Sequence, residues 1–114
     1  MAAPDGDPVF FETPEEFGAW LDANHDRARD LWVGIRKKGS ETGLTLAEAQ
    51  DWALRYGWVD SLARKFDEGA YKLRFTPRRR TSNWTDTNVA RAEELRAQGL
   101  MHEAGIRALE QRRR

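Results

Sequence analysis

The chain has 114 residues and a mass of 13.1 kDa, enough for one domain with a modest core. Hydrophobic residues make up 39% and charged residues 33%, a composition typical of a folded, soluble protein rather than a disordered one. The absence of cysteine excludes disulfides, thiolate catalysis and zinc sites with cysteine ligands, and the presence of only two histidines argues against a histidine metal site, so we expect no metal and no cofactor.

The formal net charge of zero hides an asymmetry along the chain. Residues 1–57 contain 6 Lys/Arg and 11 Asp/Glu, a net charge of −5, whereas residues 58–114 contain 13 Lys/Arg and 8 Asp/Glu, a net charge of +5. If folding keeps the halves apart, the basic half offers a surface to anions. If folding mixes the halves, the asymmetry carries no functional meaning.

Residues 1–8 are predicted to form a flexible leader. They lack the basic and apolar regions of a signal peptide, and no apolar run in the chain approaches the roughly 20 residues of a membrane span. We therefore expect a cytoplasmic protein without membrane insertion, whose single domain covers residues 9–114.

A short apolar run at residues 9–11 is typical of an edge or buried strand, and a helix start follows it. Thr13 can cap the first free amides, Pro14 suits the first helical position, and Glu16 suits a capping box. Residues 22–25 are expected to end this helix. Its apolar face comprises Phe17, Trp20 and Leu21.

Residues 31–38 are rich in strand-forming side chains and lead into a turn or loop at residues 39–43. Thr45 and Glu48 form a second capping box, which predicts a helix that Gly57 ends. The apolar stripe of this helix comprises Leu46, Ala49, Trp52, Ala53 and Tyr56.

Residues 58–66 and 70–76 flank a short loop that contains Gly69, a pattern that predicts an antiparallel hairpin. In the second strand apolar side chains alternate with cationic ones, so one face is expected to join the core and the other to meet water. The inward set is Tyr71, Leu73 and Phe75, and the outward set is Lys72 and Arg74.

Residues 88–98 are predicted to form a third helix that Gly99 ends, and residues 102–114 a fourth. His25 is expected to end the first helix and His102 to begin the fourth. Together these elements predict an α+β fold: a small, mainly antiparallel sheet packed by two helices, with C-terminal helices over one side. The tryptophans expected in the core, rather than around a ligand, are Trp20, Trp32, Trp52 and Trp58.

Four motifs occur in one order along the chain. They are Phe11-x-Thr-Pro-Glu-Glu-Phe, Gly57-Trp58-Val59-Asp60, Phe75-Thr76-Pro77-Arg78-Arg79 and Ser82-Asn83-Trp84-x-x-x-Asn88. From about Phe10 to Leu109 the chain resembles the YdeI/OmpD-associated, or bacteriocin-protection, family, in a short form that lacks the usual C-terminal helical segment. The resemblance implies a small, uncharacterised bacterial cytoplasmic protein, associated with tolerance of cationic antimicrobial peptides or with stress, that has no established reaction.

The loop at residues 78–84 is the most informative segment for function, because three arginines precede Ser-Asn-Trp. Guanidinium groups bind phosphate through paired hydrogen bonds, Trp84 could stack on a ring, and a cap at Ser82, Asn83 or Thr85 would turn free helix amides toward the same loop. We therefore expect this loop to bind an anionic, phosphate-bearing ligand or a protein partner. The candidate ligand-binding residues are Asp60, Lys72, Arg74, Arg78, Arg79, Arg80, Ser82, Asn83 and Trp84.

Two alternatives give the arginines another role. In a purely structural one, Arg78 and Arg79 pair with Asp60, Asp67 or Glu68 inside the domain, and Trp84 belongs to the core. In the other, the protein is a nucleic-acid-binding module whose arginines contact phosphates.

An enzyme is a further alternative, with Asp60 as a general base beside apolar neighbours and Ser61, Ser82 or Tyr71 as its partner. No nucleophile-elbow, phosphate-loop or HExxH spacing supports a reaction, so the favoured function is not enzymatic. The thin apolar stripes of the last two helices also leave a homodimer open.

Overall fold

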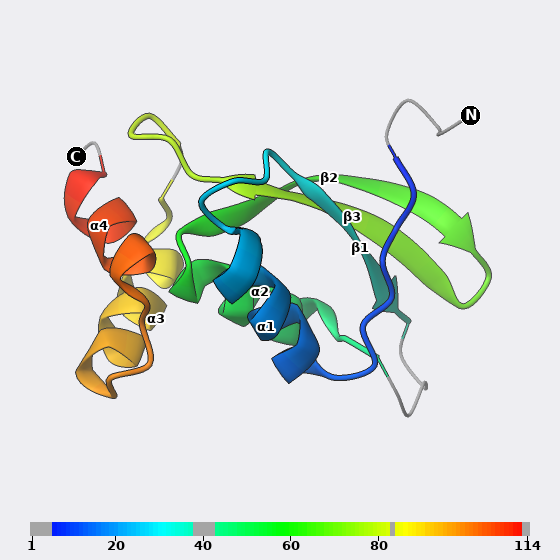
Figure 1. The fold of residues 1–114 in the computed structure, drawn as a ribbon, viewed down its shortest axis with the longest axis horizontal. Coiled ribbons are helices and arrows are strands. Elements are labelled where there is room, and N and C mark those ends of the chain that lie inside the picture. The colour runs from blue at the N-terminus through cyan, green and yellow to red at the C-terminus, as the bar shows by residue number, and fades with distance from the viewer. Residues whose placement is uncertain (1–5, 38–42, 83, 113–114) are drawn as a thin grey trace.

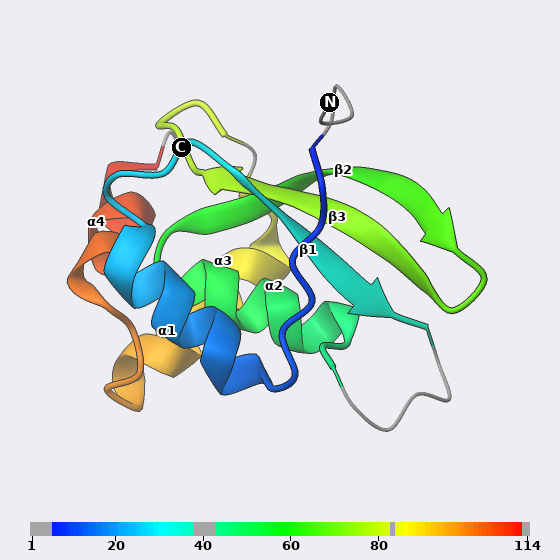
Figure 2. The same cartoon turned by 45° about the vertical axis from the view of Figure 1, so that its right-hand side comes forward.

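The computed structural model describes residues 6–37, 43–82 and 84–112. In chain order, the elements are α1 (Pro14–Asn24), β1 (Leu31–Arg36), α2 (Leu46–Arg55), β2 (Trp58–Asp67), β3 (Ala70–Pro77), α3 (Asp86–Ala97) and α4 (Glu103–Gln111). Helices α1 and α2 lie side by side against one face of the sheet, and α3 and α4 gather at one end of the molecule (Figures 1 and 2). The predicted α+β fold is confirmed.

The three strands form an antiparallel sheet in the order β1-β3-β2. Strand β3 therefore lies in the centre, with Leu31 of β1 opposite Phe75 and Trp58 of β2 opposite Pro77. The predicted hairpin is confirmed, and its turn is held by the Gly69 amide, which donates to Asp67 Oδ1 at 2.8 Å.

Local side-chain chemistry starts the helices where the sequence predicted. Thr13 Oγ1 accepts a hydrogen bond from the Glu16 amide at 3.2 Å, and Thr45 forms a reciprocal capping box with Glu48. Gly57 ends the connection after α2 with a φ of 75°, a value that favours glycine. Leu46 was predicted to belong to the apolar stripe of this helix, but it is the first residue of α2 and is 40% exposed.

Two apolar clusters fill the interior. The first lies between the sheet and helices α1 and α2, and it comprises Phe17, Leu21, Val33, Ile35, Leu44, Ala49, Ala53, Trp58, Leu73 and Phe75. The second joins α2 to α3 and α4, and it comprises Leu54, Ala92, Leu95 and Leu109. The C-terminal helices are thus attached to the end of α2 rather than to the sheet.

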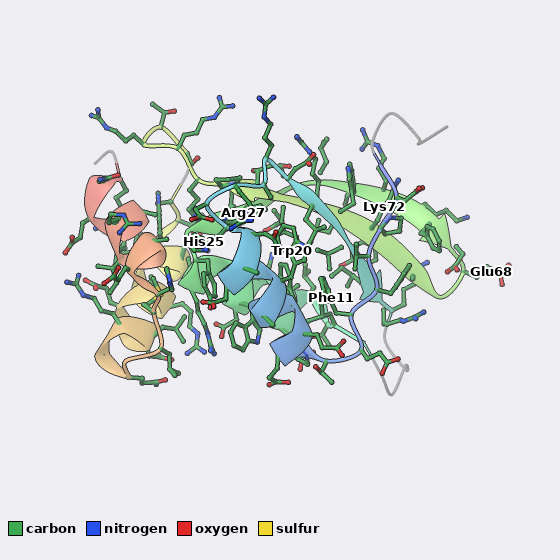
Figure 3. All side chains as sticks on the ribbon, viewed as in Figure 1. Phe11, Trp20, His25, Arg27, Glu68 and Lys72 are labelled. Atoms are coloured by element: carbon green, nitrogen blue, oxygen red, sulfur yellow. The ribbon has the colours of Figure 1, made fainter. Side chains whose placement is uncertain are left out.

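The outer face of the sheet is partly covered by the N-terminal segment, which corrects the expectation of a wet face. The Val9 amide donates to Trp32 O and the Gly34 amide donates to Val9 O, each at 2.8 Å, so the strand predicted at residues 9–11 is reduced to one parallel bridge. Lys72 is only 7% exposed; its ammonium donates to Gly6 O and lies 4.9 Å from the Trp32 ring centroid (Figure 3). Trp32 is buried as predicted, but beneath this segment.

Some predicted features fall on residues that the structure does not describe. Of the predicted leader only Gly6, Asp7 and Pro8 are described, and of the predicted loop at 39–43 only Gly43 is. Within the described ranges, no helix is long and apolar enough to cross a membrane.

Candidate functional site

Arg78 is fixed at both its backbone and its side chain. Its amide donates to the Gly57 carbonyl at 2.8 Å, which extends the end of the hairpin by one bond. Its guanidinium lies over the indole of Trp84, with Cζ 4.1 Å from the ring centroid. Trp84 in turn packs against the second apolar cluster. The loop that follows β3 is therefore tied to the α2–α3–α4 junction.

The charge of Arg78 is held in a partly buried position. Burial lowers the pKa of Arg78 to about 10, and the nearby charge of Asp60 acts in the opposite direction. The side chain stays cationic at neutral pH. Because a partly desolvated cation is less well hydrated than an exposed one, an anion bound beside it would gain more than at an open surface.

On one side of Arg78 lies an open cavity of about 630 Å³. We call it the basic groove, and its lining residues are Ala28, Arg29, Ser61, Arg74, Thr76, Pro77, Arg78, Arg79 and Ser82. Four guanidinium groups and three hydroxyl groups thus share one concavity. None of these described lining residues is acidic.

The antiparallel pairing of β1 with β3 explains how distant residues meet in the basic groove. Leu31 lies opposite Phe75, so the residues just before β1 lie beside the end of β3. Arg29 enters the groove from that connection, and Asp30 accepts a hydrogen bond from Arg74 Nε at 2.9 Å. This carboxylate orients Arg74 while leaving the rest of its fork for another acceptor.

A tight turn shapes the other wall of the groove. The Arg79 amide donates to Ser82 Oγ at 2.7 Å, and the Ser82 amide donates to Arg79 O at 2.9 Å. The side chain of Arg79 is exposed beside this turn, which leaves its guanidinium accessible to a ligand.

Arg78 also lines a smaller and more enclosed cavity of about 190 Å³. We call it the inner cavity, and its lining residues are Gln50, Ala53, Leu54, Trp58, Val59, Asp60, Arg78, Thr85 and Asn88. Asp60 accepts a long hydrogen bond from Gln50 Nε2, at 3.4 Å. Arg78 therefore lines two cavities of different chemistry.

The structure brings four of the predicted site residues together in the basic groove, namely Arg74, Arg78, Arg79 and Ser82. Asp60 belongs to the inner cavity instead. Lys72 lies elsewhere, under the N-terminal segment, because its strand position points it at Trp32. The side chain of Arg80 is exposed and does not line the groove.

The last two predicted site residues are Trp84 and Asn83. Trp84 stacks on Arg78 and packs on the second cluster, and it is not among the described residues that line the groove. Asn83 lies outside the described residues. Of the three proposed caps, Thr85 begins α3: its hydroxyl accepts from the Asn88 amide, and the Asn88 side chain accepts from the Thr85 amide.

Sequence reasoning missed Arg29, Thr76 and the role of Ser61 in the groove. Arg29 is 45 positions or more from the other groove arginines, and only the β1–β3 register brings it close. The sequence does place Arg29 shortly after the end of the first helix. No local pattern, however, indicates that its side chain lines a groove beside the end of β3.

The alternative in which Arg78 and Arg79 pair with acidic residues inside the domain is partly wrong. Glu68 lies at the tip of the β2–β3 hairpin, at the opposite end of the molecule from the loop at 78–82 (Figures 1 and 3), so neither it nor the adjacent Asp67 can pair with these arginines. Asp60 does lie within electrostatic range of Arg78. The packing of Trp84 on the second cluster agrees with this alternative.

The proposed catalytic pairs with serine are not supported by the geometry. Ser61 and Ser82 line the basic groove, whereas Asp60 lines the inner cavity. The Ser61 hydroxyl donates to the Arg74 carbonyl at 3.3 Å. Tyr71 does interact with the charge of Asp60. Burial raises the pKa of Tyr71, and the negative charge of Asp60 raises it further.

Fold and site together define a small α+β domain whose central hairpin ends in an arginine-rich groove. The family model for a domain of unknown function, DUF8412, matches residues 9–108, and the chain belongs to this family. Neither a curated protein nor a solved structure matches the chain.

Proposed function

We propose that the protein binds a phosphate-bearing ligand in the basic groove and catalyses no reaction on it. The observation that carries this proposal is the convergence of Arg29, Arg74, Arg78 and Arg79 on one cavity. Guanidinium groups match phosphate with paired hydrogen bonds, and hydroxyl groups donate to the remaining phosphate oxygens. The cavity volume of about 630 Å³ falls within the usual range of small-molecule sites.

The composition of the groove favours phosphate over nucleobase recognition. Its described lining residues include no aromatic side chain, and the nearby Trp84 is already stacked on Arg78. Single-stranded nucleic acids usually bind through aromatic stacking as well as through charge. A nucleic-acid ligand would therefore be held by its backbone, and this is the second candidate function.

The proposed cellular role rests on the resemblance to the YdeI/OmpD-associated family. We propose that anion binding by the groove, or binding of an acidic protein partner there, serves bacterial tolerance of stress or of cationic antimicrobial peptides in the cytoplasm. Deletion of the gene, complemented with wild type or with a groove variant, tests this role through survival after exposure to such a peptide. Equal rescue by both would sink the link between groove and tolerance.

The binding proposal is tested by calorimetry with inorganic pyrophosphate as the probe. Wild type is expected to bind pyrophosphate saturably. The double variant Arg74→Gln/Arg79→Gln is expected to bind it at least about tenfold more weakly, because each lost charged hydrogen bond contributes roughly 1.5–3 kcal/mol. Arg80→Gln is the matched control, since Arg80 lies in the same loop but outside the groove. Equal weakening by both variants, or no binding by wild type, would overturn the proposal.

Labelled single- and double-stranded oligonucleotides separate the second candidate. Binding that weakens steeply between about 50 and 200 mM salt, with the slope of several released counterions, would favour the nucleic-acid function. Pyrophosphate binding without oligonucleotide binding would favour a small phosphorylated ligand.

A further inference from the structure

We infer that the inner cavity is a second binding site, and that it takes a small zwitterion of the size of an α-amino acid with a short apolar side chain. This site is separate from the proposed phosphate site in the basic groove, although Arg78 forms a wall of both.

Four segments of the chain build the inner cavity. Gln50 comes from α2, Asp60 from β2, Arg78 from the residues after β3, and Asn88 from the first turn of α3. Apolar walls are supplied by Trp58 and Leu54, which are 1% and 4% exposed. A cavity with apolar walls and a few convergent polar groups has the general character of a small-molecule site.

The charges in the inner cavity call for a ligand that carries both signs. Among its described lining residues, Asp60 is the one carboxylate and Arg78 the one guanidinium. A ligand carboxylate would pair with Arg78, and a ligand ammonium would donate to Asp60 and leave Gln50 as a neutral hydrogen-bonding neighbour. A ligand with a single charge would pair with only one of these two side chains. The other side chain would then face a group of like charge or an uncharged group.

The remaining polar side chains limit where the ligand can bind. Thr85 Oγ1 accepts from the Asn88 amide at 3.1 Å, and Asn88 Oδ1 accepts from the Thr85 amide at 3.3 Å. The side-chain oxygens of both residues are thus engaged in capping α3. The charged contacts of the ligand therefore fall to Asp60 and Arg78, with Gln50 as their polar neighbour.

The volume of the inner cavity sets the ligand size. At about 190 Å³ it is somewhat larger than an apolar cavity of roughly 150 Å³ that accommodates benzene. It therefore suits roughly six to nine non-hydrogen atoms, the range from alanine to leucine. Dinucleotides and larger cofactors do not fit.

Calorimetry with valine and its two halves tests the requirement for both charges. Wild type is expected to bind valine saturably, and to bind isobutylamine and isovalerate at least about tenfold more weakly, because each half forfeits one charged pair. Isovalerate binding as tight as that of valine would overturn the inference in favour of a simple anion site. Absence of binding by every amino acid from alanine to leucine would also overturn it.

Variants then locate the site. Asp60→Asn keeps the side-chain size and removes the charge, so it is expected to weaken valine binding at least about tenfold. Arg74→Gln, in the groove alone, is the control: it should leave valine affinity within about twofold while weakening pyrophosphate binding. Gln50→Ala, at an exposed helix position, serves as a second variant if Asp60→Asn unfolds, and it should weaken valine binding severalfold. Unchanged valine affinity in both cavity variants would refute the site, whereas pyrophosphate binding would report separately on the groove.

Discussion

The guanidinium of Arg78 lies 4.1 Å from the centroid of the Trp84 indole, and this contact joins the site to the packing of the C-terminal helices. Trp84 packs against the second apolar cluster, while Arg78 lines both the basic groove and the inner cavity. The orientation of the Arg78 guanidinium therefore depends on how α3 and α4 pack against α2. A planar guanidinium can make this contact and still present donors to a ligand.

Arg78→Lys tests that relationship, because lysine keeps the charge but loses the planar fork. We expect the free energy of unfolding to fall by about 0.5–2 kcal/mol, the usual range for a cation–π contact from exposed to desolvated sites. Urea denaturation measures it. Arg80→Lys, at an exposed position in the same loop, should change the stability by less than about 0.5 kcal/mol. Equal effects of the two variants would contradict the proposed importance of the stack.

Trp58→Ala tests the first core cluster. Trp58 is 1% exposed, and its ring lies edge-on to that of Trp20 with the ring centroids 5.7 Å apart. Truncation should therefore lower the free energy of unfolding by about 3–5 kcal/mol. Leu46→Ala is the control, because Leu46 is 40% exposed and should lose far less. If Trp58→Ala does not fold, Trp58→Phe gives a smaller loss that thermal unfolding can measure. An unchanged melting temperature would contradict the core assignment.

The features that the sequence predicted well depend on contacts within a few residues. The caps at Thr13 and Thr45 bond to amides three positions away, and the hairpin turn is closed by Asp67 and Gly69. Such interactions form whatever the rest of the chain does. The predicted starts of α1 and α2 and the predicted hairpin are therefore confirmed, whereas α3 begins at Asp86 rather than at residue 88.

The features that the sequence could not predict depend on strand register and on the path of the N-terminal segment. Lys72 bonds to Gly6, 66 positions away, and Arg74 bonds to Asp30, 44 positions away. The alternation of β3 predicts which side chains share a face but does not say what covers that face. For this reason the predicted single cluster of cations is divided between the groove and a buried position at Lys72.

The charge asymmetry of the two halves is partly cancelled by folding. Arg74 pairs with Asp30, and Arg91 pairs with Asp51, so basic residues of the second half meet acidic residues of the first. The basic groove remains because Arg29 joins it from the acidic half and no described lining residue is acidic. Local concentration of charge, rather than the division of the sequence, thus supports the anion site.

Gly105→Ala tests the docking of α4 on α2. A Cβ at Gly105 would lie 2.2 Å from the carbonyl oxygen of Arg55, a backbone atom that cannot move aside cheaply. We expect a loss of about 1–3 kcal/mol in the free energy of unfolding, as in other overpacked sites. Gly69→Ala is the control, since the nearest atom to its Cβ would be Asp67 Oδ1 at 3.8 Å. Faster hydrogen exchange of the α4 amides in Gly105→Ala alone would localise the effect, and equal stability of the two variants would contradict it.

Asp51→Asn tests the ion cluster that joins α2 to α3. Asp51 Oδ1 accepts from Arg91 Nε at 2.6 Å, and Oδ2 accepts from Arg91 Nη2 at 3.1 Å and from Arg55 Nη2 at 3.3 Å. Burial alone would raise the pKa of Asp51, but the hydrogen bonds and charges of Arg91 and Arg55 together hold it below the usual value of 3.8. A carboxylate with a lowered pKa stabilises the fold above its unfolded-state pKa, and this contribution is lost as the pH falls through the folded-state value.

The pH dependence of the free energy of unfolding should therefore differ between wild type and Asp51→Asn. At pH 7 the variant is expected to be less stable by about 1–2 kcal/mol, the range for charged hydrogen bonds that are partly exposed to solvent. Because the asparagine does not titrate, the difference should shrink as the pH falls from about 5 toward 2, which urea denaturation across that range measures. Glu93→Gln, at an exposed position of α3, is the control and should show little difference at any pH. A gap for Asp51→Asn that stays constant or widens in acid would show that the carboxylate charge is not what stabilises this junction.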